Sequence, residues 1–260
     1  MYFVYLSVSR HFMKKSVKKI EYLLTDEALE SITLNIVGEN EPVNKKLKEL
    51  ENTTLVVVQD NQLKFYSTLK LNNQIFTCDL PQPTSLFLFQ AEHFTESTLK
   101  IQKQFYNYTD FNLSLTEERN GEIKVINDEF FNLFIIYKIS AITSFIMTVE
   151  CHLNHLIPLN YKFEISEGKK VDKDYIERTF SIKDKFRLLQ EILPQNSFLK
   201  KNSEIDKILN LNNLRNDFIH LKTEKDKKNM SNYINNYQKI INLDLRKNLK
   251  IIQSFVKNGG

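Results

Sequence analysis

The sequence predicts an α+β N-terminal domain, residues 1–122, followed by an all-α, up-and-down helical bundle, residues 123–260. Three observations lead to this prediction. Between Thr53 and Phe89, short β-branched and aromatic runs alternate with turn residues, which is typical of a small antiparallel sheet. From Asn127 onward, apolar residues recur at steps of three and four, the period of amphipathic helices. Asn120-Gly121 separates the two patterns and marks the boundary, because both residues favour turns.

The first domain opens with a basic amphipathic segment from Lys14 to Leu24, which predicts a helix. Such a helix could rest on a membrane surface, but the acidic residues that follow favour a solvated face. Near the end of this domain, Tyr106, Tyr108 and Phe111 either pack against the sheet or form a recognition surface. The role of the domain is left open between sensing and partner binding.

The predicted sheet has four strands, each bounded by Asn, Asp or Pro. Asp60-Asn61 and Asn72-Asn73 suit hairpin turns, because Asn and Asp tolerate positive φ. The strands are expected at residues 55–58, 63–67, 74–78 and 85–89.

The second domain is expected to hold four helices joined by short links, which is the pattern of an up-and-down bundle. Pro158 and Pro194 end the first two helices, because proline disfavours helical backbone in the residue before it. Ser181 and Ser203 begin the second and third as N-caps. A polar loop is expected from Leu159 to Tyr175. The helices are expected at residues 127–158, 181–193, from 203 through the stretch 211–222, and 229–256.

Composition indicates a soluble globular protein, with 42% hydrophobic and 26% charged residues in a chain of 260. The formal charge of +4 is unevenly placed. From Lys200 to Gly260 there are thirteen Lys or Arg against six Asp or Glu, so this segment carries +7 and the rest of the chain −3. The asymmetry suits a polyanionic partner, although a lysine-rich solvated helix face would have the same composition.

A cytoplasmic location without membrane attachment is expected. The start of the chain, Met1 to Leu6, is too short and too aromatic for a secretory signal. The most apolar window, Phe130 to Val149, is interrupted by Lys138, so we expect a buried helix rather than a membrane span. Cys78 and Cys151 lie far apart and suit a reducing compartment.

The stretch Leu211 to Lys222 places strong polar chemistry in a helix-period apolar pattern. Asn212, Asn216 and His220 step by four residues and therefore stack on one helix face, flanked by Arg215 and Asp217. Of these groups only the imidazole has an ordinary pKa near neutrality. The opposite, apolar face is formed by Leu211, Leu214, Phe218 and Leu221.

The hexapeptide Arg215-Asn216-Asp217-Phe218-Ile219-His220 resembles the R-N-x-x-x-H signature of HEPN domains. This helical family includes many metal-independent ribonucleases of toxin–antitoxin, anti-phage and RNA-targeting CRISPR systems. Upstream, Glu150 to Pro158 is similar to the E-x-x-x-N-x-x-I-P pattern that ends a long helix in such proteins. Lys185 to Pro194 is similar to their Lys-led helix ending in Leu-Pro. The resemblance covers roughly the C-terminal half and implies a HEPN-like bundle that acts as a homodimer.

Cleaving RNA without a metal requires a base for the ribose 2′-OH, an acid for the leaving 5′-oxygen, and positive charge on the phosphate. The resemblance implies that Arg215, Asn216 and His220 are catalytic. His220 would be the base or acid, Arg215 would hold the phosphate, and Asn216 would orient the imidazole or a phosphate oxygen. Because one chain offers one such imidazole, the signature helices of two protomers would face each other.

Four further residues are expected to support the site or bind RNA, namely Asp217, Glu150, Asn154 and Lys222. The alternatives are a surface pair of Arg215 and Asp217, an interior His220, a polar stripe at the bundle end for Glu150 and Asn154, and a solvated Lys222.

Neither a cofactor nor a metal is expected. The sequence contains no Gly-rich phosphate loop, and His152 and His155 lack a partner at recognised metal-ligand spacing.

The resulting expectation is an endoribonuclease acting as a toxic effector in antiviral defence, by abortive infection, or in a toxin–antitoxin system. RNA, a second copy of the chain, and an antitoxin or sensor protein are the expected partners. The alternative is a catalytically inactive HEPN-like module for dimerisation or nucleic-acid binding.

Overall fold

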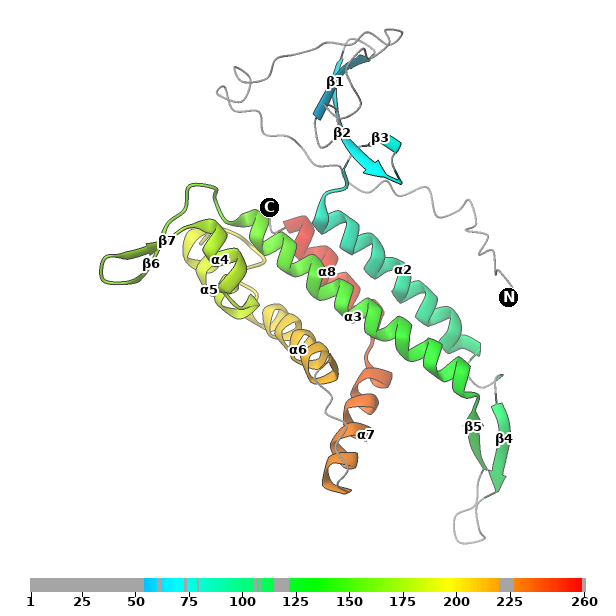
Figure 1. The fold of residues 1–260 in the computed structure, drawn as a ribbon. Helices are drawn as coiled ribbons and strands as arrows, with labels where there is room; N and C mark the ends of the chain where they lie inside the picture. Colours follow the sequence, from blue (N-terminus) through cyan, green and yellow to red (C-terminus); the bar gives the residue numbers. More distant parts are fainter. Residues whose placement is uncertain are drawn as a thin grey trace. The chain divides into compact units, whose positions relative to one another are not determined.

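The computed structural model describes residues 54–59, 62–72, 74–78, 80–104, 107, 109–114, 122–219 and 227–258. The described part is mostly helical, with seven helices and a few short strands (Figure 1). Its contacts divide the chain into two compact units, Met1–Ser85 and Leu86–Gly260. The predicted helix from Lys14 to Leu24 lies outside the described residues.

The first unit contains a three-stranded antiparallel sheet of order β1-β2-β3. Its strands are β1 (Thr54–Gln59), β2 (Gln62–Leu71) and β3 (Gln74–Cys78). Gln59 pairs with Gln62, and Leu71 pairs with Gln74, so both connections are tight hairpins. Asn72 has a φ of 47°, as expected for a turn residue that tolerates the left-handed region. The first three predicted strands are confirmed.

The fourth predicted strand, residues 85–89, is wrong because these residues belong to helix α2 (Pro83–Gln104). Pro83 can occupy the first helical turn, where its missing N–H is not needed. Ala91 of α2 is fully buried, and Phe94 lies 6.0 Å from Tyr137 of the next helix, measured between ring centroids. Tertiary packing on the helical unit therefore overrides the local strand preference.

Helix α2 belongs to the second unit by its contacts. Gln253 of the last helix donates from Nε2 to Oε1 of Glu92 at 2.7 Å. The division between units accordingly falls at Ser85 and Leu86, ahead of the boundary expected near residue 122.

The second unit is built around helix α3 (Asp128–Leu156), which confirms the long helix expected from 127 to 158. The side chain of Asn127 caps its start by accepting from the backbone N–H of Phe130 at 3.2 Å. Helix α3 is long and apolar enough to cross a membrane by length and composition, and 44% of its most apolar window is buried inside the protein. Its buried apolar side chains are Phe134, Ile135, Ala141, Ile142, Phe145, Ile146, Val149 and Leu153.

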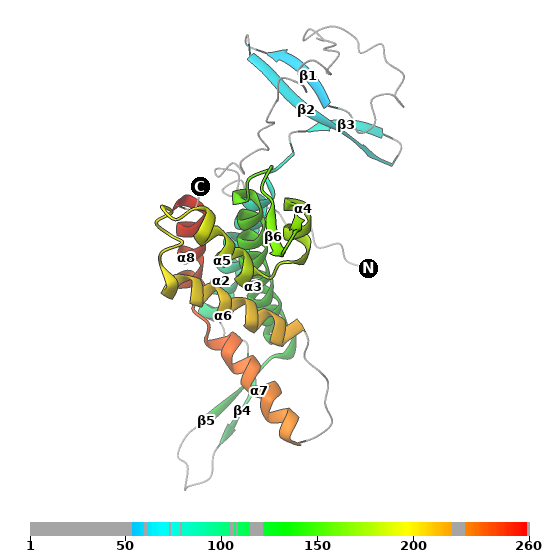
Figure 2. The same ribbon diagram turned by 90° about the vertical axis from the view of Figure 1, so that its left-hand side faces the viewer.

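Four helices pack on α3, as Figures 1 and 2 show from two directions. They are α5 (Ile182–Ile192), α6 (Asn202–Ile219), α7 (Lys227–Asn242) and α8 (Leu245–Asn258). Ser181 caps α5 as predicted, since its Oγ accepts from the N–H of Asp184 at 3.2 Å. The prediction of a single final helix from 229 to 256 is wrong, because residues 243 and 244 interrupt it and separate α7 from α8.

Three smaller elements complete this unit. One hairpin pairs β4 (Thr109–Ser114) with β5 (Glu122–Ile126), and the short helix α4 spans Lys173–Thr179. A second hairpin, β6 (Phe163–Ser166) with β7 (Lys169–Val171), occupies part of the segment expected to be a loop. Gly168 makes its tight turn possible with a φ of 75°.

The break between α7 and α8 is fixed by Lys138, a residue of α3 with 1% exposure. Its Nζ donates to the carbonyl oxygens of Ile240 at 2.9 Å and Leu243 at 3.1 Å, and to that of Ile241. These carbonyls lie at and just beyond the end of α7, where helical N–H partners run out, although that of Ile240 also accepts from the N–H of Leu243 at 3.2 Å. Asp244 then caps α8 by accepting from the N–H of Lys247 at 3.0 Å.

Burial lowers the pKa of Lys138 to about 8, partly offset by the negative charge of Asp244. Between pH 8 and the ordinary lysine value of 10.5, the unfolded chain therefore binds the Lys138 proton more tightly than the folded chain. The free energy of unfolding should rise across this interval by on the order of 1 to 3 kcal/mol relative to a Lys138→Met variant. Urea denaturation of both proteins at the two ends of the interval measures the difference, and parallel pH profiles would contradict it.

Candidate functional site

Helix α6 carries most of the R-N-x-x-x-H stretch and presents its apolar face to the core. Leu211 and Leu214 are buried, as the spacing predicted. Phe218 packs against the core from its edge, with its ring 5.4 Å from that of Tyr237 on α7. The last two turns of α6 are therefore held between α3 and α7. Leu221, His220 and Lys222 lie outside the described residues.

Arg215 and Asn216 are half-buried and Asp217 is exposed. The Nε atom of Arg215 is buried and has no hydrogen-bond partner. No ion pair joins Arg215 to Asp217 within the part of the chain that the structure describes, as expected for residues two apart on a helix. A buried guanidinium N–H without an acceptor costs roughly 1 to 3 kcal/mol or more, so the Arg215 side chain gains free energy if it turns toward an acceptor such as a phosphate oxygen.

Aromatic rings surround the base of this site. Tyr237 stacks on Phe131 of α3 at 6.5 Å and lies 4.9 Å from Tyr233, measured between ring centroids. The hydroxyls of Tyr233 and Tyr237 are 3.2 Å apart. Burial, the hydrogen bond to Tyr233 and the proximity of that ring raise the pKa of Tyr237 to about 12. Tyr237 is thus a neutral packing residue near neutral pH rather than an acid or base.

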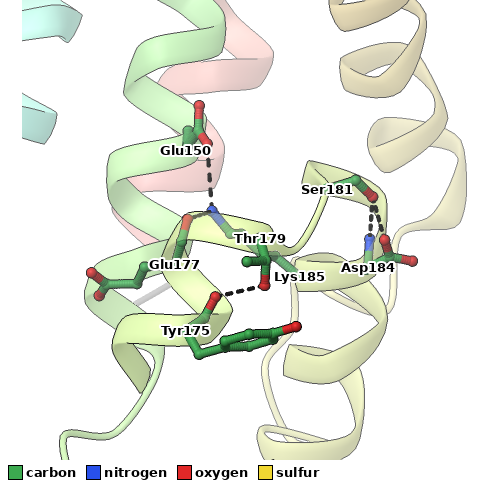
Figure 3. Close-up of polar contacts among 7 residues, drawn as sticks. All are labelled: Glu150, Tyr175, Glu177, Thr179, Ser181, Asp184 and Lys185. Atoms are coloured by element: carbon green, nitrogen blue, oxygen red, sulfur yellow. Dashed lines mark hydrogen bonds and ion pairs between the residues drawn. The ribbon is translucent and has the colours of Figure 1, made fainter. Parts of the chain in front are cut away.

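Glu150 and Asn154 lie on the C-terminal half of α3. Figure 3 shows the Glu150 carboxylate facing Lys185 of α5, whose Nζ lies 3.4 Å from Oε1 of Glu150. Lys185 is fully buried and also donates to the backbone oxygen of Glu177, in the last turn of α4, at 2.8 Å. This lysine therefore joins α3, α4 and α5.

Within one chain the structure does not bring Glu150 and Asn154 together with the signature. Phe218 lies beside Tyr237, which stacks on Phe131 in the first turn of α3. Glu150 follows Phe131 by more than five helical turns, roughly 28 Å along the axis of α3. No hydrogen bond or ion pair links either residue to Arg215 or Asn216 among the described side chains. Glu150 has a structural partner in Lys185, which sequence spacing alone could not identify.

The histidines and the cysteine near Glu150 show no arrangement for catalysis or metal binding. His152 is buried with its ring 4.8 Å from that of Phe255, whereas His155 is exposed. Burial and the nearby Glu150 carboxylate raise the pKa of the Cys151 thiol, partly offset by Lys185, so this thiol is not activated as a nucleophile. No group of three or more His, Cys, Asp or Glu side chains in the described ranges is placed to hold a metal ion.

Comparisons of the chain with protein-family models, with curated proteins and with solved structures gave no match. Function is therefore inferred from the residues and their geometry.

The Glu150 and Lys185 contact makes a specific prediction about stability. Lys185→Met should lower the free energy of unfolding by about 2 to 4 kcal/mol, because it leaves the Glu177 carbonyl and the Glu150 carboxylate without their donor. Glu150→Gln should cost about 1 kcal/mol or less, since Glu150 is 36% exposed and water can replace the lysine. Urea denaturation of both single variants and the double variant measures the coupling, and fully additive losses would show that the pair does not interact.

Proposed function

We propose that this chain is a metal-independent endoribonuclease that acts as a HEPN-like homodimer, with Arg215, Asn216 and His220 as its catalytic residues. The observation that carries the proposal is the half-buried guanidinium of Arg215, whose buried Nε has no acceptor among the described residues. It lies at the helix end where the sequence resembles the ribonuclease signature. The Nε itself is closed off from solvent, so the guanidinium would take a phosphate in its fork after the side chain turns outward.

The reaction follows from these groups. A neutral His220 imidazole takes the proton of a ribose 2′-OH, and the 2′-oxygen attacks the adjacent phosphorus. Arg215 donates to the non-bridging oxygens as negative charge accumulates on them. The bond from phosphorus to the 5′-oxygen then breaks, and the protonated His220 of the second protomer gives its proton to that oxygen. The products are a 2′,3′-cyclic phosphate and a free 5′-hydroxyl.

The arrangement of helices supports a HEPN-like bundle as the finer description of the second unit. The three stretches that resemble the family lie on α3, α5 and α6, in the expected order. Two of them meet through Lys185 and Glu150. We infer from this contact that the Glu and Lys positions serve the fold of the bundle, whereas the end of α6 serves the chemistry.

The cellular role that fits this activity is a toxic effector in the cytoplasm, in antiviral defence or paired with an antitoxin. The sheet of the first unit would then be a sensing or partner-binding module.

The alternative function is nucleic-acid binding without scission, or dimerisation alone. The net charge of +7 between Lys200 and Gly260 favours binding of a polyanion independently of the signature.

We predict that Arg215→Ala and His220→Ala each lower the rate of RNA cleavage at least about 100-fold, because each removes a group used in the transition state. Arg215→Lys should also be strongly impaired, since lysine keeps the charge but loses the fork. Single-turnover cleavage of a labelled single-stranded RNA in excess chelator measures the effect.

The matched control is Arg187→Ala, which removes an exposed arginine from α5. It should cleave like the wild type. Circular dichroism and sedimentation must show that all four variants keep their fold and oligomeric state. Undiminished cleavage by Arg215→Ala or His220→Ala would exclude the proposal, and RNA binding without any cleavage by the wild type would favour the alternative.

A further inference from the structure

A cleft of about 480 Å³ is lined by helices α6, α7 and α8, of which α6 contacts both others. Figure 2 shows α6 crossing near the junction of α7 and α8. Each of these helices contributes one lysine to its lining, namely Lys207, Lys239 and Lys247. Lys239 and Lys247 are exposed and Lys207 is half-buried. Lys207 forms an ion pair with Glu204 at 3.2 Å, and Lys239 donates to the side-chain oxygen of Asn236 at 3.4 Å. Neither contact is buried, so both ammonium groups remain able to reach a ligand.

Asparagine side chains accompany the lysines around the cleft. Asn210 of α6 and Asn242 of α7 are exposed, and an amide can both donate and accept hydrogen bonds. Asn248 of α8 donates to the backbone oxygen of Asp244 at 2.7 Å. Amides beside lysines suit a ligand that carries anionic groups together with neutral donors and acceptors, such as a nucleotide.

Four apolar side chains, here called the floor, belong to the lining of the cleft: Leu211, Leu214, Leu243 and Ile251. An apolar surface of this kind can cover the flat face of a base, while the lysines at the edge reach the phosphates on either side. The volume is within the range of about 300 to 1,000 Å³ that is usual for small-molecule sites.

Asp244 is the carboxylate that lines the cleft among the described residues. It accepts from the backbone N–H of Lys247 as the cap of α8, and its charge acts on the buried ammonium of Lys138. The carboxylate is therefore occupied within the protein. The three lysines outnumber it, so the cleft is cationic.

We propose that this cleft binds single-stranded RNA, holding a nucleotide on the apolar floor and its flanking phosphates on Lys207, Lys239 and Lys247. Leu211 and Leu214 of α6 line the cleft, so it lies on the same helix as the signature, although Arg215 itself points to another side of that helix. The inference rests on the proposed function in one respect, namely that the bound strand is the substrate. Binding itself does not require cleavage.

The test uses the full chain and a short fluorescein-labelled oligouridylate with 2′-O-methyl sugars, which cannot be cleaved by 2′-OH attack. Fluorescence anisotropy gives its Kd over a series of salt concentrations. Lys207→Gln, Lys239→Gln and Lys247→Gln should each weaken binding roughly threefold to tenfold at low salt. Each should also reduce the slope of log K against log salt by about 0.7, the value for one phosphate contact on a single strand.

A matched triple control removes the same charge elsewhere. Lys169, Lys170 and Lys183 are exposed on β7 and α5, away from the cleft lining. Their replacement by Gln should leave Kd close to that of the wild type. The comparison is the variant that combines all three cleft substitutions. If it and the control weaken binding equally, the proposal is overturned, because the protein then binds RNA by net charge alone.

A second pair of variants tests the floor without changing charge. Asn242→Trp places a large side chain at the cleft and should abolish most binding, whereas Asn235→Trp, at an exposed position of the same helix outside the lining, should not. Unchanged binding by Asn242→Trp would mean that no nucleotide occupies the floor.

The two proposals fail separately. If the wild type binds the oligonucleotide through the three lysines but cleaves no RNA, RNA binding at the cleft is supported and the ribonuclease proposal is excluded. If cleavage depends on Arg215 but binding does not depend on the three lysines, the ribonuclease proposal is supported and RNA binding at the cleft is excluded.

Discussion

The second unit depends on the buried ammonium group of Lys138. Lys138 sits in the middle of α3 with its Nζ among the carbonyl oxygens that end α7. Leaving a lysine in an apolar interior without acceptors would be strongly unfavourable, and leaving the carbonyls of Ile241 and Leu243 without this donor would be unfavourable as well. The hydrogen bonds between the ammonium group and the carbonyl oxygens remove both penalties. The chain therefore has to turn between α7 and α8 at this point, and Leu243 and Asp244 at the turn become part of the wall of the basic cleft.

Two other lysines close helix ends in the same way. Lys173 donates to the backbone oxygen of Ile157 at the end of α3 at 2.7 Å, and Lys185 donates to that of Glu177 near the end of α4. In each case the cation meets the negative end of a helix dipole. Lys138, Lys173 and Lys185 therefore have structural roles at helix ends, and they differ in this from Lys207, Lys239 and Lys247, which line the cleft.

Sequence reasoning succeeded where local rules decide the structure. Ser181 caps α5 as predicted, and the hairpin turn at Asn72 follows from its tolerance of positive φ. The N-cap predicted at Ser203 is wrong, because α6 begins at Asn202 and Ser203 lies inside it. Sequence reasoning failed where distant residues decide. The local signal for the break between α7 and α8 is the N-cap residue Asp244, which a continuous apolar period outweighed. The donor that holds the carbonyls there, Lys138, lies about one hundred residues earlier, and no general rule connects the two positions. The strand pattern at 85–89 was overridden in the same manner by packing of α2.

The candidate site shows the same division. Spacing located Leu211 and Leu214 on the core face and Arg215 beside them. It could not show that Glu150 is engaged by Lys185, since the lysine comes from another helix. Nor could it place the cleft, which exists only once α6, α7 and α8 are assembled.

Helix α8 supplies Phe255, whose ring is fully buried against Phe186 and Phe198 and which also contacts His152. Its neighbour Gln253 is bonded to Glu92 of α2, so the earliest and latest helices of this unit lie against each other. Without α8, the rings of Phe186 and Phe198 and part of the buried face of α3 would lose their apolar cover. A variant cut short before α8 would therefore expose apolar surface and tend to aggregate.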